Sequence, residues 1–442
     1  MFRFNDSMPV EFNDALPDKV DVAVVGAGVI GISTAWYLVE KGLSVLVCDK
    51  GRVAGEQSSR NWGWVRAAFR DAAEAPIVVD SQRCWREISG ALDEDTGFHQ
   101  GGTLTLTTTD KGLAEYDDWL EIAKQHGIDS RPLSRAEISK AIDVAEGDWR
   151  GGMITPGDCR AEPFKAVPAI ARGLHKRGGL IRENCAVRTV DIEAGNVCGI
   201  VTEHGRVRAD AVVFAGGAWS NLFLSNLGVS FPQLLVRNSV ARTATAPKVF
   251  DGAAGLQDIY IRRRQDGGYT VACEFNEHTI GANSFRYMVP FLPALFSDSE
   301  IHLRVGSDAA QQSLLQKRWS GDDATLFEKH RVLNPAPSQR ALKIMHRNLA
   351  RRVPRLAGIE FVETWAGMID ATPDIVPVMD GIESHPGLFL ASCFSGHGFG
   401  IGPGAGKVMA NHVTGNDTGF DLTRFRFGRF SDGSKMVPGP AL

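Results

Sequence analysis

The 442-residue sequence predicts two domains of mixed α/β and α+β character, a discontinuous one on a parallel sheet and an antiparallel-sheet domain interleaved with it. Three observations predict this arrangement. A chain of this length exceeds one ordinary core. A strand, a glycine-rich turn and a helix follow one another at residues 20–50, and the same order returns at 387–415. Short alternating strands separated by turn sequences lie between them, as in antiparallel hairpins.

The first glycine-rich turn reads VVGAGVIGI at residues 24–32. Gly26 allows the tight turn, Gly28 lets a ligand approach the backbone, and Gly31 lets the helix pack on the strand. The helix that follows offers free N–H groups to phosphates. Asp49 ends the next apolar run, at the spacing of an acid that binds a ribose hydroxyl. The stretch predicts a Rossmann-like dinucleotide site, in which NAD and FAD are both open at this point.

The segments between the two turns predict further elements. We expect a helix over 75–88, an exposed strand in the alternating segment 97–109, and a helix within 163–180. Short strands separated by AGN and EHGR turns then precede the fully apolar AVVFAGG at 211–217. An antiparallel hairpin followed by a buried strand is typical of a nucleotide-binding sheet that resumes after an excursion.

Composition and charge exclude several classes of protein. The net charge is −4 and the 48 Lys and Arg residues are scattered, which argues against a nucleic-acid surface. The one short basic run, Arg262 to Arg264, is typical of a solvated strand edge. Seven cysteines without a CxxC pair or zinc-type spacing predict a reducing compartment and no metal site. With no signal segment and no apolar run of membrane-spanning length, we expect a cytoplasmic protein.

One apolar segment, MVPFLPALF at 288–296, has two interpretations. A buried loop or helix start is the first. A partner surface or a peripheral membrane contact is the alternative.

The second glycine-rich turn, SGHGFGIGP at 395–403, decides between the two dinucleotides. An NAD enzyme usually needs one such turn, whereas a buried flavin needs backbone contacts at its far end. N–H groups at the start of the helix here would face the flavin pyrimidine and stabilise negative charge as the ring is reduced. The pair of turns therefore favours FAD.

At this point the chain resembles the FAD-dependent D-amino-acid oxidase-like family, of the glycine oxidase, sarcosine oxidase and D-amino-acid dehydrogenase type. The resemblance covers nearly the whole chain. It rests on the order and spacing of five motifs, which are VVGAGVIGIS with Asp49, GEQSSRNWGW at 55–64, VVFAGGAWS at 212–220, WAGMIDATPDIVPVMD at 365–380 and SGHGFGIGPGAGK at 395–407.

The resemblance implies a discontinuous FAD-binding domain at 1–90, 150–225 and 355–425, and a substrate-binding domain at 91–149 and 226–354 whose sheet covers the flavin. The cofactor-binding residues that it implies are Gly26, Ala27, Gly28, Val29, Ile30, Gly31, Asp49, Lys50, Ser58, Ser59, Asn61, Trp62, Gly63, Val187, Ala215, Gly216, Gly217, Trp219, Gly367, Met368, Asp374, Gly396, His397, Gly398, Phe399, Gly400 and Ile401. Val187 would meet the adenine, Ser58 and Ser59 the pyrophosphate or ring edge, and the residues from Gly367 onward the flavin.

The sequence departs from the family in two places. Several relatives attach the flavin through a Cys just before the TPD segment, and 365–374 contains none, so we expect non-covalent FAD. Many relatives carry a carboxylate-binding Arg where this chain has Met368. The substrate anchor must therefore lie elsewhere, or the substrate lacks an α-carboxylate.

The family reaction moves a hydride from the carbon next to an amine nitrogen to flavin N5 and leaves an imine that hydrolyses, by oxidative deamination or N-dealkylation. The expected substrate is a small molecule, either an amino acid or an N-substituted amine, and the acceptor is O₂ or a carrier. The planar guanidinium of an arginine matches the two oxygens of a carboxylate. We therefore expect Arg66, or in second place Arg262, to bind the substrate carboxylate. Tyr260 and His397 are expected in the same site. The alternative is a flavin subunit of a heteromeric amine-oxidising complex that passes electrons to a partner.

Overall fold

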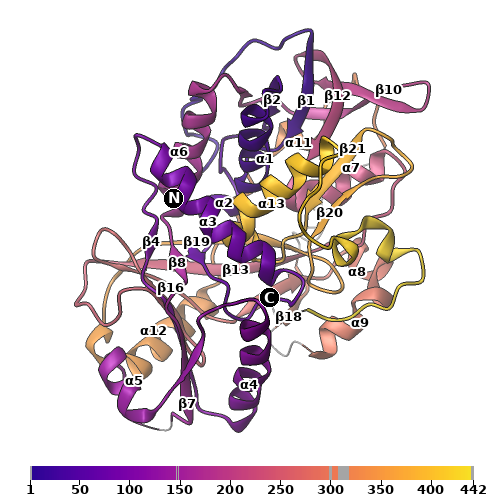
Figure 1. Ribbon diagram of the computed structural model, residues 1–442. Coiled ribbons are helices and arrows are strands. Elements are labelled where there is room, and N and C mark those ends of the chain that lie inside the picture. Colours follow the sequence, from indigo (N-terminus) through magenta and orange to yellow (C-terminus); the bar gives the residue numbers. More distant parts are fainter. Residues whose placement is uncertain (1, 146, 148, 298–300, 307–317, 440–442) are drawn as a thin grey trace.

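The computed structural model describes residues 2–145, 147, 149–297, 301–306 and 318–439. Two large sheets lie at opposite ends of the molecule, with β1, β2 and β12 at the top of Figure 1 and β7 and β16 at the bottom. This mixed α/β arrangement of parallel and antiparallel sheets confirms the predicted fold class.

The first sheet has the strand order β10-β11-β12-β1-β2-β9, with β21 and β20 joined to β12. Its strands are β1 (Lys19–Val25), β2 (Val45–Cys48), β9 (Leu180–Arg182), β10 (Val187–Glu193), β11 (Asn196–Thr202), β12 (Gly205–Phe214), β20 (Val378–Gly381) and β21 (Leu388–Ser392). The strands β21, β12, β1, β2 and β9 run parallel, whereas β10 and β11 form the antiparallel excursion. The hairpin followed by a buried strand is therefore present.

Helices bury the first sheet. They are α1 (Val29–Glu40), α2 (Gln57–Arg60), α3 (Ala75–Ala91), α6 (Pro163–Lys176), η1 (Gly217–Trp219), α7 (Ser220–Asn226) and α13 (Gly398–Val413). The two helices that follow the glycine-rich turns, α1 and α13, pack directly on each other. A Cβ at Gly406 would lie 2.5 Å from the Cβ of Ser33, so the glycines of α13 permit this close approach. The two turns therefore open on the same region of the molecule.

The second sheet has the order β18-β17-β13-β16-β15-β14-β5-β7-β6, and β19 pairs with β13. Its strands are β5 (Thr103–Thr107), β6 (Arg131–Leu133), β7 (Gly151–Thr155), β13 (Leu234–Thr243), β14 (Ala253–Leu256), β15 (Tyr260–Arg263), β16 (Tyr269–Ala272), β17 (Asn276–Thr279), β18 (Ile301–Arg304) and β19 (Phe361–Ala371). The long β13–β19 pair runs from Leu234 opposite Ala371 to Thr243 opposite Phe361.

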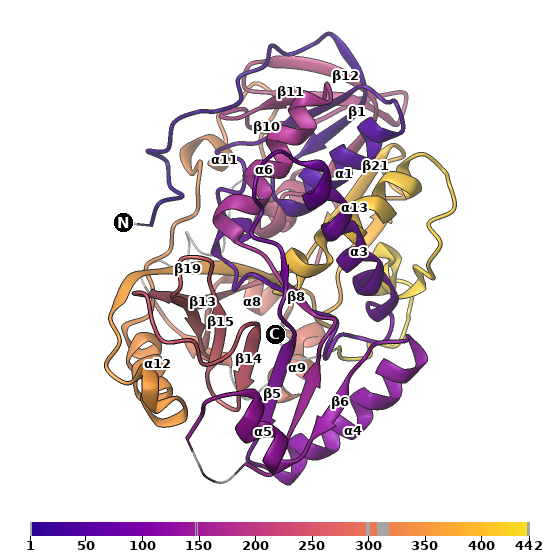
Figure 2. The same cartoon turned by 60° about the vertical axis from the view of Figure 1, so that its left-hand side comes forward.

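The remaining elements surround the second sheet and complete the chain. They are β3 (Trp64–Val65), β4 (His99–Gln100), β8 (Cys159–Arg160), α4 (Asp110–Gln125), α5 (Arg135–Ala141), α8 (Ala282–Arg286), α9 (Met288–Ser297), α11 (Leu326–Lys329), α12 (Gln339–Arg352), η2 (Pro354–Leu356), η3 (Thr423–Phe425) and η4 (Phe427–Phe430). Figure 2 shows α4, α5 and α12 around the second sheet and α1, α3, α6 and α13 around the first. The small sheet β3-β8-β4 lies between the two sets.

The strand β5 corrects one expectation. The alternating segment 97–109 predicted an exposed strand, but Leu104 and Leu106 and the flanking threonines Thr103 and Thr107 are buried. The reason is its place in the sheet, because β5 pairs with β14 on one side and with β7 on the other. Its faces are covered as well, because Leu104 and Leu106 join a core cluster with Ile261 and Val271 and α4 packs against Thr107 on the other face.

Sheet membership also bears on the expected domain limits. The segments 150–225 and 355–425 were assigned to the FAD-binding domain, yet β7 and β19 belong to the second sheet. The chain therefore returns to the first sheet only after residues 155 and 371, whereas the expected limits were 150 and 355.

The apolar segment 288–296 forms α9. Phe291 and Ala294 are buried, whereas Val289 is 72% exposed and Met288 49% exposed. One side of the segment thus packs and the other faces outward, and a peripheral membrane contact stays a prediction. Within the described ranges, none of the helices is long and apolar enough to cross a membrane.

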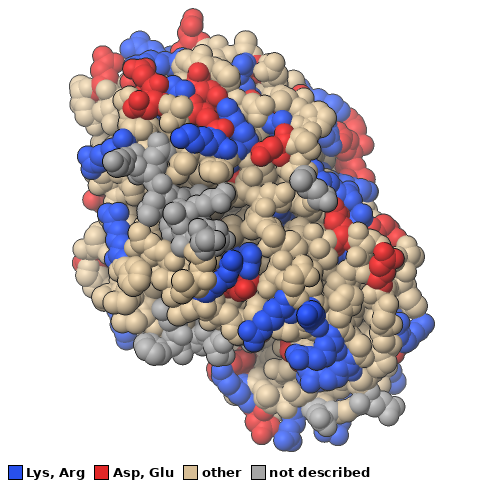
Figure 3. Space-filling view, turned by 180° about the vertical axis from the view of Figure 1, so that it is seen from behind, with Lys and Arg blue, Asp and Glu red and all other residues tan. Residues whose placement is uncertain are grey.

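Acidic and basic side chains are interspersed over much of the face that Figure 3 shows. This mixing agrees with the scattered lysines and arginines of the sequence.

Candidate functional site

The first glycine-rich turn has the backbone that its spacing predicted. Gly26 adopts φ +105°, and a Cβ there would lie 2.6 Å from the carbonyl oxygen of Ala215. A Cβ at Gly31 would lie 1.9 Å from the Gly26 oxygen, so this glycine brings α1 against the strand. Gly28 precedes α1, which has no side-chain cap of its own. The Val29 N–H donates to the Ser58 hydroxyl at 2.8 Å, and the turn leaves the next N–H groups of α1, those of Ile30 and Gly31, for a ligand.

Asp49 stands beside this turn at the end of β2. Its two carboxylate oxygens accept the N–H groups of Ala27 at 2.8 Å and of Gly51 at 2.7 Å. Burial raises the pKa of Asp49, while Lys50 and the two N–H groups act in the opposite direction. The carboxylate is thus held in a fixed position at the edge of a cavity, as a ribose-binding acid requires.

A first cavity of about 1200 Å³ follows the carboxyl ends of the parallel strands. Sixteen of the predicted cofactor residues line it, namely Gly26, Gly28, Val29, Ile30, Asp49, Lys50, Ser58, Asn61, Val187, Ala215, Gly216, Gly217, Trp219, Gly396, Gly398 and Phe399. They come from both ends of the chain and from the returning strand β12. The cavity has the place in the fold where open α/β sheets bind dinucleotides.

Sequence reasoning missed several residues of this cavity. Glu56 accepts hydrogen bonds from Lys50 at 2.6 Å and from the Trp219 indole at 3.1 Å, and so organises one wall. Asp370, on β19, lines the cavity near the second turn, and burial raises its pKa to about 6. Both acids lie inside quoted motifs, Glu56 in 55–64 and Asp370 in 365–380, but neither residue was assigned a role there.

A second cavity of about 800 Å³ adjoins the first and shares Gln57, Asn61, Gly396 and Phe399 with it. Its other lining residues come from α2, the loop before α3, β13, β19 and the start of α13, with two more beside β17; they are Arg60, Trp62, Trp64, Arg66, Arg70, Asn238, Val240, Glu274, Asn276, Gly367, Ile369 and His397. The cavity lies where the second sheet meets the two glycine-rich turns. The cavity therefore adjoins the end of the first cavity that the second glycine-rich turn borders.

An aromatic group forms one wall of the second cavity. The Trp62 ring stacks on Tyr260 with centroids 5.0 Å apart, and Trp64 meets Trp62 edge-on at 5.9 Å. The Trp62 indole donates to Asn238, 3.3 Å away, whose amide donates in turn to Asn276. Tyr260 does not line the cavity but supports Trp62 from outside it.

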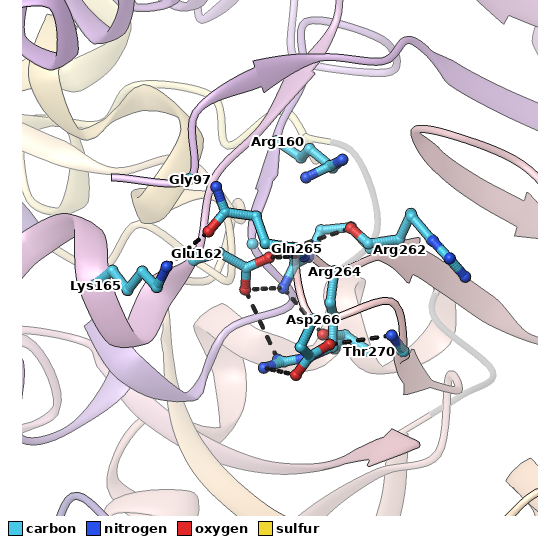
Figure 4. Close-up of polar contacts among 12 residues, drawn as sticks. Gly97, Arg160, Glu162, Lys165, Arg262, Arg264, Gln265, Asp266 and Thr270 are labelled. Carbon is cyan, nitrogen blue, oxygen red and sulfur yellow. Dashed lines mark hydrogen bonds and ion pairs between the residues drawn. The ribbon is translucent and has the colours of Figure 1, made fainter. Parts of the chain in front are cut away.

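Arg262 does not line the second cavity, and Figure 4 shows it in the group of polar residues around Glu162. Its guanidinium donates to both oxygens of Glu162, at 3.0 and 3.2 Å, and also to the Trp62 carbonyl and the Thr270 hydroxyl. The side chain is 1% exposed and has no donor left for a substrate. Arg262 therefore cannot serve as the second-ranked carboxylate anchor.

The basic run around Arg262 is likewise not a solvated strand edge. Arg264 is 7% exposed and pairs with Asp266 at 3.0 Å and with Glu162 at 3.8 Å. The run instead joins the start of α6 to the second sheet (Figure 4). Gly63 serves the same junction, because a Cβ there would lie 2.6 Å from the Nε of Arg262.

Two other arginines do face the second cavity. Arg66 lies over the Trp64 ring, 5.2 Å from its centroid, and Arg70 is 7% exposed. No hydrogen bond or ion pair joins either guanidinium to another residue within the described part of the chain. Burial, followed by the charge of Arg66, lowers the pKa of Arg70 to about 9. Within the described residues, neither cation therefore has an anionic partner in direct contact.

His397 ends the turn before α13. Its Nδ1 lies 3.3 Å from the Glu74 carboxylate, and both side chains are buried. Burial, together with Arg70, lowers the pKa of His397 and keeps the ring neutral at pH 7. Like α1, α13 has no side-chain cap, and Gly398 and Phe399 at its start line the first cavity. The positive end of a second helix therefore faces the cavity.

Eight predicted cofactor residues line neither cavity. Ala27, Gly31, Ser59, Gly63, Met368, Asp374, Gly400 and Ile401 are packing or turn residues. Met368 points into the core because side chains alternate along β19, so that its neighbours Gly367 and Ile369 face the second cavity instead. Asp374 forms a buried ion pair with Arg429 at 2.9 Å and fixes the C-terminal segment.

Local packing explains the others. The Gly400 carbonyl accepts hydrogen bonds from Ser81 and Trp85 of α3. Ser59 turns its hydroxyl to the Glu56 carbonyl, 3.1 Å away, and not to the cavity.

With this geometry established, comparison with known proteins identifies the family. Residues 21–412 match the DAO family, the FAD dependent oxidoreductases. The chain therefore belongs to this family of FAD-dependent enzymes, and FAD is its cofactor. The residues present fit that group, because the two uncapped helix ends, the glycine cradle and Asp49 border one continuous cavity.

Several relatives cover almost the whole chain. Human mitochondrial sarcosine dehydrogenase is 23% identical over 93% of it, and the chain spans 42% of that relative's length. Sarcosine oxidase subunit beta of Arthrobacter sp. is 24% identical, with 93% and 92% of the two chains covered. The structure of the L-amino acid deaminase of Proteus myxofaciens with anthranilate superimposes with a TM-score of 0.92 at 28% identity, covering 97% of each chain. The names of these relatives all describe enzymes that oxidise amino acids or amines.

Proposed function

We propose that this chain oxidises the C–N bond of an amino acid, whose carboxylate Arg66 binds in the second cavity. The imine product then hydrolyses. FAD, when bound, supplies the hydride acceptor for this reaction. The similarity to an L-amino acid deaminase supports deamination as the outcome, whereas the sarcosine-oxidising relatives support N-dealkylation.

The observation that carries the proposal is the unpaired guanidinium of Arg66 beside the flavin end of the dinucleotide cavity. An Arg fork matches the two oxygens of a carboxylate, and a partly buried one binds it more strongly than a solvated one. Arg60 lines the same cavity, but both of its Nη atoms are occupied by the Ala366 and Phe4 carbonyls and by Asn334, and its Nε alone is buried without a partner among the described residues. Arg66 takes the role that Met368 cannot fill.

The remaining residues of the second cavity position the substrate and limit water. Trp62, Trp64 and Phe399 give it an apolar wall, which restricts the substrate to a narrow set of orientations. Neutral His397 adds no charge that would repel the substrate amine. The chain thus provides binding and orientation with little acid–base chemistry of its own.

The experiment is a substrate screen on the purified holoprotein without oxygen. D- and L-amino acids, N-methyl amino acids and cyclic amines are added, and loss of the flavin absorption at about 450 nm is followed. Bleaching by amino acids or their N-methyl derivatives supports the proposal. A protein that stays yellow with every compound contradicts it.

The similarity to a sarcosine oxidase subunit favours a second candidate, a flavin subunit whose electrons leave to a partner protein. An artificial electron acceptor distinguishes the two. Turnover by the chain alone supports an autonomous enzyme, whereas bleaching without turnover supports the subunit.

A further inference from the structure

The charged lining of the second cavity is unbalanced. Its charged side chains are Arg60, Arg66, Arg70 and Glu274, and His397 is neutral. Arg60 donates to backbone carbonyls and an amide but to no carboxylate. The lining side chains thus include three arginines and one acid, and the carboxylates of Glu56, Glu74 and Asp158 act on these arginines from outside the lining.

If Arg66 binds the α-carboxylate of the substrate, Arg70 is still without an anionic partner among the described residues. It is 7% exposed, and its Nη1 is buried without a hydrogen-bond partner. Burying an unpaired donor on a charged group costs several kcal/mol, and such a cost is normally retained only where a ligand relieves it.

The acids behind Arg70 do not bind it. One oxygen of Glu74 lies beside His397, and one oxygen of Asp158 accepts from the Ala67 N–H and from Gln82, while the second oxygen of each acid is buried without a partner within the described residues. Both influence Arg70 through space, but neither forms an ion pair with it. Arg70 thus lines the second cavity with a guanidinium whose Nη1 has no partner in the described part of the chain.

We infer that the substrate carries a second acidic group and that Arg70 binds it while Arg66 holds the α-carboxylate. The inference rests on the proposed function and names its substrate class, a dicarboxylic α-amino acid. Two guanidinium groups four residues apart on one loop repel each other, and two anions relieve both. A neutral side chain at the same place would leave Arg70 desolvated and unpaired.

Matched acid–amide pairs test the inference on the holoprotein. Glutamate is compared with glutamine, and aspartate with asparagine, each as both stereoisomers, by the rate of anaerobic flavin reduction. Acid and amide have nearly the same shape, so the comparison isolates the charge. We expect kcat/KM for the better acid to exceed that of its amide at least tenfold.

Two variants locate the effect. In Arg70→Gln the acid-to-amide ratio should fall toward one, mainly through a higher KM for the acid. In Arg66→Gln both members of a pair should lose activity together. Arg83→Gln, a change at a surface arginine whose side chain is 62% exposed, is the matched control.

An amide that reduces the flavin as well as its acid overturns the inference and leaves the proposed function intact, because one carboxylate then bridges both arginines. A preference for acids that persists in a yellow, folded Arg70→Gln also overturns it. If that variant does not fold, the acid–amide ratio of the parent protein decides. Failure of every amino acid, acidic or neutral, to reduce the flavin contradicts the proposed function itself.

Discussion

Glu162, at the start of α6, binds Arg262 on β15 through both carboxylate oxygens, at 3.0 and 3.2 Å, with both side chains buried. The pair joins the helical layer of the first sheet to the second sheet (Figure 4). It also fixes the Trp62 carbonyl, which accepts from the same guanidinium. The aromatic wall of the second cavity is therefore attached to this ion pair.

Removing one member of the pair should destabilise the protein strongly. Arg262→Met leaves the buried Glu162 carboxylate with the longer Arg264 contact, at 3.8 Å, as its remaining ion pair, which costs up to about 3–5 kcal/mol in the free energy of unfolding. Urea denaturation measures the loss. The double variant Glu162→Gln/Arg262→Met should be more stable than Arg262→Met alone. If its loss of stability instead equals the sum of the losses in the two single variants, the residues do not act as a pair.

Asp49 should contribute to FAD binding through its fixed carboxylate. Asp49→Ala should weaken FAD binding by about 1–3 kcal/mol, the scale for losing a charged acceptor. Titration of the apoprotein with FAD measures the change. Asp210→Ala, at an aspartate whose side chain is 63% exposed, is the control. Equal FAD affinity in a folded Asp49→Ala would remove Asp49 from the cofactor site.

Asp370 should give the apoprotein a pH-dependent stability. Its pKa of about 6 lies above the value of about 3.9 in an unfolded chain. The folded state therefore holds the proton more tightly, and stability declines as pH rises through this window. Asp370→Asn releases no proton, so its stability relative to the parent should grow by about 1–1.5 kcal/mol between pH 5 and 8. Urea unfolding at several pH values checks this, and a constant difference would contradict it.

The flavin should be released by acid. No cysteine lies in 365–374, and among the described residues lining the two cavities the one cysteine is Cys48, at the nucleotide end beside Asp49. Acid precipitation of the holoprotein should therefore leave the yellow colour in the supernatant. Colour that stays with the washed pellet would show a covalent bond to the flavin.

Local backbone chemistry made the cofactor cavity predictable. Gly26, Gly28 and Asp49 act through turn geometry, helix ends and a fixed distance along the chain, all of which a short stretch of sequence carries. The second turn at 395–403 was predictable for the same reason.

The residues that depend on distant partners were not predictable. From the sequence, Arg262 was predicted to be a free carboxylate anchor. In the structure its guanidinium binds Glu162, which lies a hundred positions away in the chain. The direction of Met368 follows from the register of β19 on β13, and the burial of β5 from its two neighbours. Glu56 and Asp370 lie in recognised motifs and Arg70 lies outside them, but the roles of all three depend on cavities that form only when both ends of the chain meet.

The most direct test of the account compares an amino acid that reduces the flavin with the amine that lacks its carboxylate, in the parent and in Arg66→Lys. The parent should be reduced far faster by the amino acid. In Arg66→Lys, which keeps the charge but loses the fork, kcat/KM for the amino acid should fall by about 2–4 kcal/mol, with unchanged FAD content. Equal reduction of the parent by the acid and the amine, or unaltered kinetics in Arg66→Lys, would contradict the carboxylate-anchored reaction.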